Sequence, residues 1–418
     1  MSGTVNLDLD IHSVHPPGGL INIDIFGTGI NTIIILILFF IVSVLIISIL
    51  SKSKIIEFRR ALLIFSFHSI ISAIFITALM TLIVNDLDSY FQIGIIYPED
   101  GYSKYYNSIK TLGILTISQF YRFFYYFFKL DFLAVNILFG CIGSFVLIFY
   151  DKLLLQNFNL KKNKKDLRHY LFLLIVFFPS LSVWSGYLGK EILTLTIFIC
   201  SAFILIKEKS LMLKTLFLLP LVGLLGLIRP HFAFLFIFTL IIYLFLKIFK
   251  KSKFKYLLII ISSFFLLVLG QFFIGGDMNF NVVKLVDVFL ESGAIQRKYF
   301  LPVSEWNDVQ NSNPLFLWIS FIFTPIFNLE NPRNIVISLE NIILIIALII
   351  LIFNTDIKKL NENDEAKFFI IFFLVTSFVM SIFTYQVGIY WRQKWMLLPY
   401  LFIGMSLIQK KNFLNAKK

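Results

Sequence analysis

Long apolar runs separated by short polar segments dominate the chain. Runs such as 30–50 and 335–353 approach the roughly 20 apolar residues that a helix needs to cross a bilayer. A helix is the open-chain structure that satisfies all of its own backbone groups in lipid. The pattern therefore predicts an all-α polytopic membrane protein, with one integral membrane domain over residues 1–418. We expect about eleven transmembrane helices, over residues 30–50, 61–84, 132–150, 169–187, 190–206, 212–228, 232–249, 256–274, 335–353, 367–384 and 393–408.

The polar segments between these runs differ strongly in charge. With this set of spans, six of them fall on one side of the membrane and hold 25 of the 37 basic residues but 8 of the 24 acidic ones; they are 51–60, 151–168, 207–214, 247–255, 356–367 and 409–418. Because short cytoplasmic loops collect Lys and Arg, that side is predicted to be the cytoplasm. The N-terminus then lies outside and the C-terminus is cytoplasmic. Topology thus explains the net charge of +13, and we expect no nucleic acid partner.

The outer face is predicted to carry the larger polar regions. We expect a periplasmic arm over residues 1–29, a first periplasmic loop over 85–131 and a long periplasmic loop over 275–334. The first loop contains "TISQFYRFFYYFFK", whose aromatic residues and single Arg122 indicate an amphipathic helix lying in the membrane interface. The segment 314–327 is short and contains a proline, and making it a span would move the last two Lys-rich segments outside. It is therefore predicted to be re-entrant or interfacial.

Composition excludes several other classes. With 58% hydrophobic and 15% charged residues, the chain is too apolar for a water-soluble domain of its length. Cys141 and Cys200 both lie in apolar spans, so neither a disulfide framework nor a metal cluster is expected. The sequence contains no dinucleotide-binding glycine motif, P-loop or metal-ligand spacing. We therefore expect no cofactor and no metal.

The stretch "FFPSLSVWSGYLGKE" ends one predicted span and begins the next on the outer side. Pro179 and the pair Gly186 and Gly189 are expected to break the helix there. Lys190 and Glu191 would then lie at a helix N-terminus, where free N–H groups and the dipole favour an anion. The alternative is a plain helical hairpin with a snorkelling lysine.

Two further stretches place charge at the outer surface. In "LIRPHFAF", the proline suits the first turn of a helix, so Arg229 is expected at the cap and His231 one turn in. In "YQVGIYWRQKWMLLP", a turn is predicted to carry Arg392, Gln393 and Lys394 between two tryptophans. Taken singly, each stretch is also explained by ordinary interfacial anchoring of Arg, His and Trp.

Tryptophan is distributed as unevenly as charge. All five tryptophans are expected on the outer face: Trp184, Trp306, Trp318, Trp391 and Trp395. An aromatic belt would populate both interfaces, so this asymmetry favours stacking surfaces for a ligand. Cations also recur at the outer ends of separate helices, where the positive-inside rule selects against them. Together these groups would suit a phosphate-bearing lipid that carries a sugar.

The ordered motifs "FPSLSVWSGYLGKE", "LIRPHFAF" and "YQVGIYWRQKWMLLP" resemble those of the O-antigen or capsule repeat-unit polymerases of the bacterial inner membrane, and of their relatives among the C-type membrane glycosyltransferases. In that group a Pro-Ser and a Trp precede a Gly-Lys-acid, followed by an Arg-Pro-His and a late Arg-Gln-Lys or Arg-Gln-Arg ahead of a proline. The resemblance extends from about Asp86 to Pro399. In addition, "NDLDSYF" is similar to the acidic segment in the first outer loop of C-type transferases, although here one extra span precedes it.

The resemblance implies a C-type glycosyltransferase-like fold in the bacterial inner (cytoplasmic) membrane, with its active site on the periplasmic side. It implies a metal-independent polymerase that transfers glycan from undecaprenyl diphosphate to a lipid-linked acceptor. Its partners would be the undecaprenyl-diphosphate-linked oligosaccharide, membrane lipids and a chain-length regulator. On this basis the diphosphate ligands would be Arg229, Lys190, Arg392, Lys394 and Arg297, the candidate general bases His231, Asp88, Glu191 and Asp86, and the sugar-stacking residues the five tryptophans.

Three alternatives remain at the level of sequence. A C-type transferase that adds one sugar from a polyprenyl-phosphate donor would need the same outer site. A flippase or transporter would need ionisable residues or paired broken helices near the bilayer midplane, and only His68 is expected well inside a span. A non-catalytic scaffold is the third.

Overall fold

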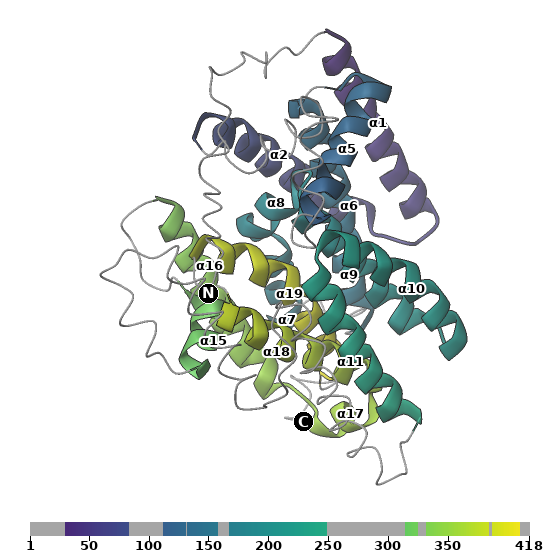
Figure 1. The fold of residues 1–418 in the computed structure, drawn as a ribbon, viewed down its shortest axis with the longest axis vertical. Coiled ribbons are helices and arrows are strands. Elements are labelled where there is room, and N and C mark those ends of the chain that lie inside the picture. Colours follow the sequence, from purple (N-terminus) through teal and green to yellow (C-terminus); the bar gives the residue numbers. More distant parts are fainter. Residues whose placement is uncertain are drawn as a thin grey trace, which may run out of the picture.

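The computed structural model describes residues 30–82, 112–130, 132–157, 167–248, 314–324, 332–383 and 387–409, and nearly all of them are helical (Figure 1). Within these ranges, Thr355 and Gln409 form an isolated antiparallel β-bridge. The helices are α1 Ile30–Lys52, α2 Phe58–Leu82, α5 Leu112–Phe128, α6 Phe132–Asn157, α7 Leu167–Val176, α8 Pro179–Ser185, α9 Lys190–Lys207, α10 Leu211–Ile228, α11 Pro230–Ile248, α15 Pro314–Phe323, α16 Pro332–Phe353, α17 Ile357–Glu362, α18 Asp364–Phe383 and α19 Val387–Leu407.

Several of these helices have the length and composition of membrane spans. Four qualify individually, in α2, α6, α10 and α16, and α8 with α9 would make a fifth as a pair bent by 102°. The predicted all-α membrane character is therefore confirmed in its coarse form. The count of eleven spans and the orientation stay predictions, and the expected span 256–274 lies outside the described residues.

The expected span 169–187 differs from the structure, which divides it into α7 and α8. The helix stops at Val176, and Phe178 has extended backbone angles (φ −64°, ψ 127°). Pro179 then occupies the first position of α8. Proline lacks an N–H and its ring would clash with the preceding turn, so it begins a new helix instead of continuing the old one.

The central helix is α6, which packs against α1, α2, α8, α9 and α19. Its glycines allow close approach: a methyl group at Gly143 would overlap the carbonyl oxygen of Ser185, and one at Gly140 would overlap the Ser72 hydroxyl. By contrast, α10 lies at the rim of the molecule (Figure 1) and exposes apolar side chains such as Met212 and Leu219. In a membrane protein such an exposed apolar face suits contact with lipid.

Two segments outside the predicted spans are also helical. The segment expected to be re-entrant or interfacial contains α15, whose ten residues are too short to cross a bilayer and which packs on α18 and α19. The expected interfacial helix is α5. It buries Ile117 and Tyr121 against the protein and exposes aromatic residues such as Phe127 on its other face. This amphipathic arrangement agrees with the sequence prediction.

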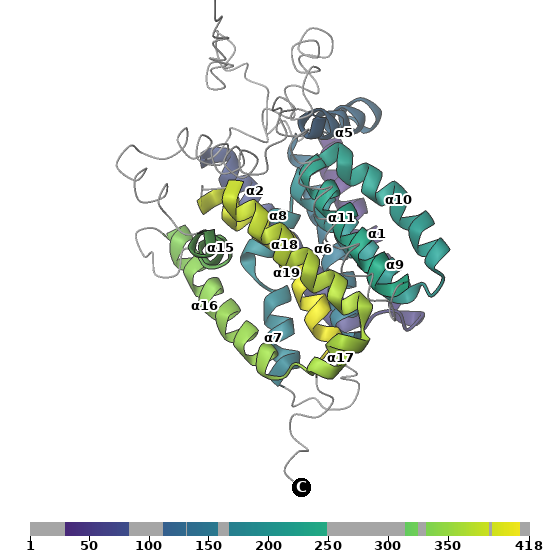
Figure 2. The ribbon, with the colours of Figure 1, turned by 60° about the horizontal axis from the view of Figure 1, so that its bottom comes forward.

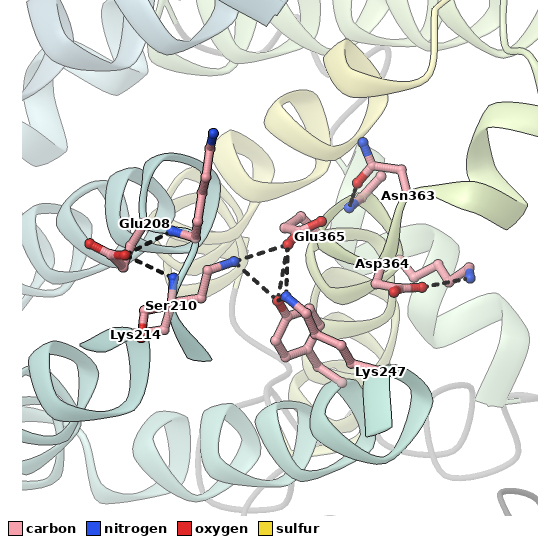
Figure 3. Close-up of polar contacts among 11 residues, drawn as sticks. Glu208, Ser210, Lys214, Lys247, Asn363, Asp364 and Glu365 are labelled. Atoms are coloured by element: carbon pink, nitrogen blue, oxygen red, sulfur yellow. Dashed lines mark hydrogen bonds and ion pairs between the residues drawn. The ribbon is translucent and has the colours of Figure 1, made fainter. Parts of the chain in front are cut away.

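A network of polar side chains joins α10, α11 and α18 (Figure 3). Lys214 Nζ lies 2.9 Å from Glu365 Oε1, and the Tyr243 hydroxyl donates to the same oxygen at 3.0 Å. Lys247 Nζ donates to the Tyr243 hydroxyl at 3.0 Å. The network therefore connects three of the segments that the charge pattern assigns to the cytoplasm.

This network lies at one end of α10, and the motif "LIRPHFAF" begins at the other. From Lys214 to Arg229 the helix rises by about 22 Å. Figure 2 likewise shows α5 and α17 at opposite ends of the molecule. The fold thus separates two polar regions across an apolar body.

Candidate functional site

The candidate site lies at the break between α8 and α9. Gly186 ends α8, and Gly189 has extended angles (φ −140°, ψ 176°) before α9 begins at Lys190. A methyl group at Gly189 would meet the Tyr187 ring and, at 2.7 Å, Glu191 Oε2. The glycine therefore leaves room for the Glu191 carboxylate to fold back toward the break.

Glu191 lies at the centre of a group of cations. Its Oε1 atom is 2.6 Å from Nη2 of Arg229 and 3.7 Å from Nε of Arg392. Lys190 also acts electrostatically on this carboxylate. Glu191 and Arg229 are only 4% and 7% exposed, so water screens the charges weakly. Three cations around one carboxylate give this group of described side chains a net positive charge.

Three helices begin beside this group. Arg229 ends α10, and its carbonyl oxygen accepts from the first-turn N–H groups of Phe232 and Ala233 in α11, so it occupies the cap position that the sequence predicted. The second residue of α5, Gly113, packs against the Ile228 carbonyl oxygen and the Lys190 side chain. The N-termini of α5, α9 and α11 therefore meet here. Each contributes partial positive charge, which the C-termini of α8 and α10 at the same place partly offset, so the three cations are the main reason that the group favours an anion.

Arg392 connects the group to an aromatic pair. Its guanidinium lies over the Trp184 ring, 4.9 Å from the ring centre. Tyr187 approaches Trp184 edge-on, with ring centres 6.1 Å apart. Cation–π contact of this kind orients a guanidinium while leaving its planar edge able to bind an oxyanion. Because Arg392 covers one face of Trp184, a sugar could stack only on the other face.

Hydrogen bonds from other helices fix the break. Asn136 Oδ1 on α6 accepts from Leu188 N at 3.0 Å and from the Tyr121 hydroxyl of α5 at 2.8 Å. On α2, the Ser72 hydroxyl donates to the Gly186 carbonyl oxygen, and His68 Nδ1 bonds the Ser182 hydroxyl. The sequence identifies His68 only as an ionisable group within a predicted span. In the structure its role is to hold α8.

His231 lies two residues after Arg229 and is exposed, with its ring 4.7 Å from that of Phe232. Arg229 and Lys190 both act on it electrostatically. The structure therefore brings together Lys190, Glu191, Arg229 and Arg392 with His231 close by, which are five of the nine ionisable residues predicted for the site and come from three separate motifs.

Lys394, a predicted diphosphate ligand, lies away from this group. Lys394 is 1% exposed, and its Nζ donates to the Ile322 carbonyl oxygen at 3.1 Å and to Asn341 Oδ1. The predicted turn around Lys394 is wrong, because the segment is helical: α19 extends over Val387–Leu407. Two residues of helix turn Lys394 about 200° away from Arg392, so it points into the protein.

Trp395 does not offer the predicted stacking surface, whereas Trp318 is only partly buried. Trp395 is buried and packs edge-on against Phe178, with ring centres 5.2 Å apart, so neither face is open to a sugar. Trp318 on α15 is partly buried, and its Nε1 donates to the Ser377 hydroxyl at 2.8 Å. Apolar packing against neighbouring helices, which the sequence does not reveal, explains both placements.

The remaining predicted residues cannot be placed at this site. Asp86, Asp88, Arg297 and Trp306 lie outside the described residues, and Trp391 belongs to α19 without a described side chain. Among the residues that the structure does describe, no group of three or more His, Cys, Asp or Glu side chains could hold a metal ion.

Sequence reasoning missed Glu340, which lies in α16 within the expected span 335–353 and is 3% exposed. His68 is therefore not the only ionisable residue well inside a span. The signal was present in "ISLENII", where a carboxylate and an amide interrupt an apolar run.

Comparisons with known proteins give no assignment for this arrangement. No family model matches the chain, no curated protein is similar to it, and no solved structure matches its fold.

Proposed function

We propose that the protein is a polysaccharide repeat-unit polymerase, of the O-antigen or capsule type, acting on the periplasmic face of the bacterial inner membrane. It transfers a glycan from undecaprenyl diphosphate to a lipid-linked acceptor. The acceptor hydroxyl oxygen attacks the anomeric carbon, and the bond from that carbon to the diphosphate oxygen breaks. The lipid diphosphate leaves with the electron pair, and a base takes the hydroxyl proton.

The observation that carries the proposal is the positive site at the α8–α9 break. Arg229, Arg392 and Lys190 surround a single buried carboxylate, and three helix N-termini begin there. Such a site favours a multiply charged anion over a neutral ligand. A departing diphosphate gains charge in the transition state, so fixed cations and dipoles beside it would lower the barrier.

The ion pair also bears on the choice of base. A carboxylate bound to guanidinium is stabilised in its charged form and is a weak proton acceptor. Glu191 therefore orients Arg229. Among the described residues we assign the base to His231, because the cations beside it keep its exposed imidazole neutral and able to accept a proton.

The C-type transferase with a polyprenyl-phosphate donor is the alternative. Its lipid phosphate carries less charge than a diphosphate, and a site with three cations favours the larger anion. Transport has some support from buried Glu340 and Lys394, because ionisable residues inside a membrane protein often mark a path for ions or substrates.

Glycan ladders from a deletion strain test these readings. Loss of a polymerase should leave lipid-linked core carrying a single repeat. Loss of a transferase should truncate the repeat itself, and loss of a flippase should leave core without any repeat. Electrophoresis of the glycolipids, with complementation by the wild-type gene as control, separates the three. A normal ladder in the deletion strain would reject all of them.

His231→Gln tests the base. Glutamine can donate and accept hydrogen bonds but cannot accept the hydroxyl proton at neutral pH, so polymer should fall by about 10²- to 10⁴-fold. The expected change is in kcat, with KM for the lipid-linked donor nearly constant, measured in membranes with purified donor. Thr239→Ser, a conservative change in the same helix, is the matched control. If His231→Gln keeps the wild-type kcat, the general base is Asp88 or Asp86 instead of His231.

A further inference from the structure

Glu340 binds the start of α8 from a helix that is distant in sequence. Ser180 is the second residue of α8, and its backbone N–H donates to Glu340 Oε1 at 2.8 Å, while its hydroxyl donates to Oε2. First-turn N–H groups have no partner within their own helix. The α16 carboxylate therefore caps α8, where the helix has no side-chain cap of its own.

The next residue of α16 binds a different helix. Asn341 Oδ1 accepts from Lys394 Nζ of α19, and Asn341 Nδ2 donates to the Phe323 carbonyl oxygen at 2.9 Å at the end of α15. Lys394 also donates to the Ile322 carbonyl oxygen and interacts electrostatically with Glu340. Two adjacent residues of α16 thus contact α8, α15 and α19.

Two of these contacted helices supply the aromatic part of the candidate site. Trp184 comes from α8, and Arg392 comes from α19, two residues before Lys394. Arg392 lies over Trp184 and 3.7 Å from Glu191. A shift of α19 would separate the guanidinium from both partners, and a shift of α8 would separate it from Trp184.

The geometry points to Glu340 and Asn341 as a pair of positioning residues, which we call the α16 clasp. The clasp holds α8 and α19 in the register that places Arg392 between Trp184 and Glu191. A carboxylate and an ammonium are costly to bury, and here both are satisfied by hydrogen bonds. The contacts of the clasp do not depend on the proposed function, whereas their consequence for activity rests on it.

Cysteine labelling tests the clasp without requiring any activity. The reporter is Ser185→Cys in a Cys200→Ala background, because Ser185 lies buried at the end of α8 and cysteine is nearly isosteric with it. Glu340→Leu removes the cap and should speed maleimide labelling of the reporter by about tenfold or more in native membranes, since local opening becomes easier. Glu340→Gln keeps an acceptor oxygen for the Ser180 N–H and should label at nearly the parental rate.

A second variant set separates the clasp from general unfolding. Buried Cys141 on α6, without the reporter, should remain unlabelled in Glu340→Leu. Asn341→Leu should also speed labelling, and adding Lys394→Met should reverse part of that effect, because a buried ammonium would no longer be left without its amide partner. Parental labelling in both Glu340→Leu and Asn341→Leu would overturn the clasp.

Activity then tests the positioning role. Glu340→Leu should lower polymer formation, and Glu340→Gln should restore most of it. Faster labelling with full polymer formation would show that the clasp does not position the site, which overturns the proposal. If the deletion strain has a normal ladder, the proposed function fails, and the labelling result still decides whether the clasp exists.

Discussion

Arg229→Lys is expected to lose most polymer even though it preserves positive charge. A charge contact made only in the transition state contributes about 2–4 kcal/mol, which corresponds to roughly 30- to 1000-fold in rate. Arg229→Ala should be at least as severe. The measurement is polymer formed per unit of membrane-inserted protein.

The reason lies in the geometry of the guanidinium. One of its nitrogens, Nη2, is bound to Glu191, which fixes the plane of the group beside the α8–α9 break. Lysine presents a single ammonium on a flexible chain and cannot bind the carboxylate and a phosphate oxygen in the same planar arrangement. The fold should survive either change, because Arg392 and Lys190 still act on Glu191.

Arg122→Lys is the matched control. Arg122 is a partly buried arginine on α5 whose guanidinium lies over the Tyr126 ring, outside the Glu191 group. This variant should form normal polymer. If Arg229→Ala gives a normal glycan ladder at the wild-type protein level, "LIRPHFAF" acts only as a membrane anchor.

Glu191→Gln is expected to have the largest effect on stability. Removing one partner of a buried ion pair leaves the other charge uncompensated and costs about 3–5 kcal/mol. Arg229 would be left buried beside two further cations, so repulsion adds to the loss. The thermal midpoint in detergent should fall clearly below that of the wild type. Glu362→Gln, which neutralises an exposed carboxylate, should leave it unchanged.

An added anion should reverse part of this loss if the site binds phosphate. At 100 times its dissociation constant, inorganic pyrophosphate would stabilise the protein by about 2.7 kcal/mol. The midpoint of Glu191→Gln should therefore rise with pyrophosphate, while Arg229→Ala should respond much less. A Glu191→Gln variant as stable as the wild type, or one indifferent to pyrophosphate, would contradict the anion site.

The sequence by itself determined the class of protein and much of its local structure. Long apolar runs require helices because lipid offers the backbone no other partner, and prolines start helices where their missing N–H costs nothing. Pro230 therefore fixed the start of α11 and placed Arg229 at its cap. The glycines of "SGYLGKE" likewise predicted the break before Lys190.

Tertiary structure alone decided which of these ends meet. Glu191 binds Arg229 and Arg392 from distant motifs, and Glu340 caps a helix 160 residues earlier in the chain. Trp395 shows the converse, because its place next to the predicted interfacial cations Arg392 and Lys394 gave no sign that it packs in the core. A local pattern reports the ends and faces of one helix, whereas the partner of each charged or aromatic group depends on how separate helices pack against one another.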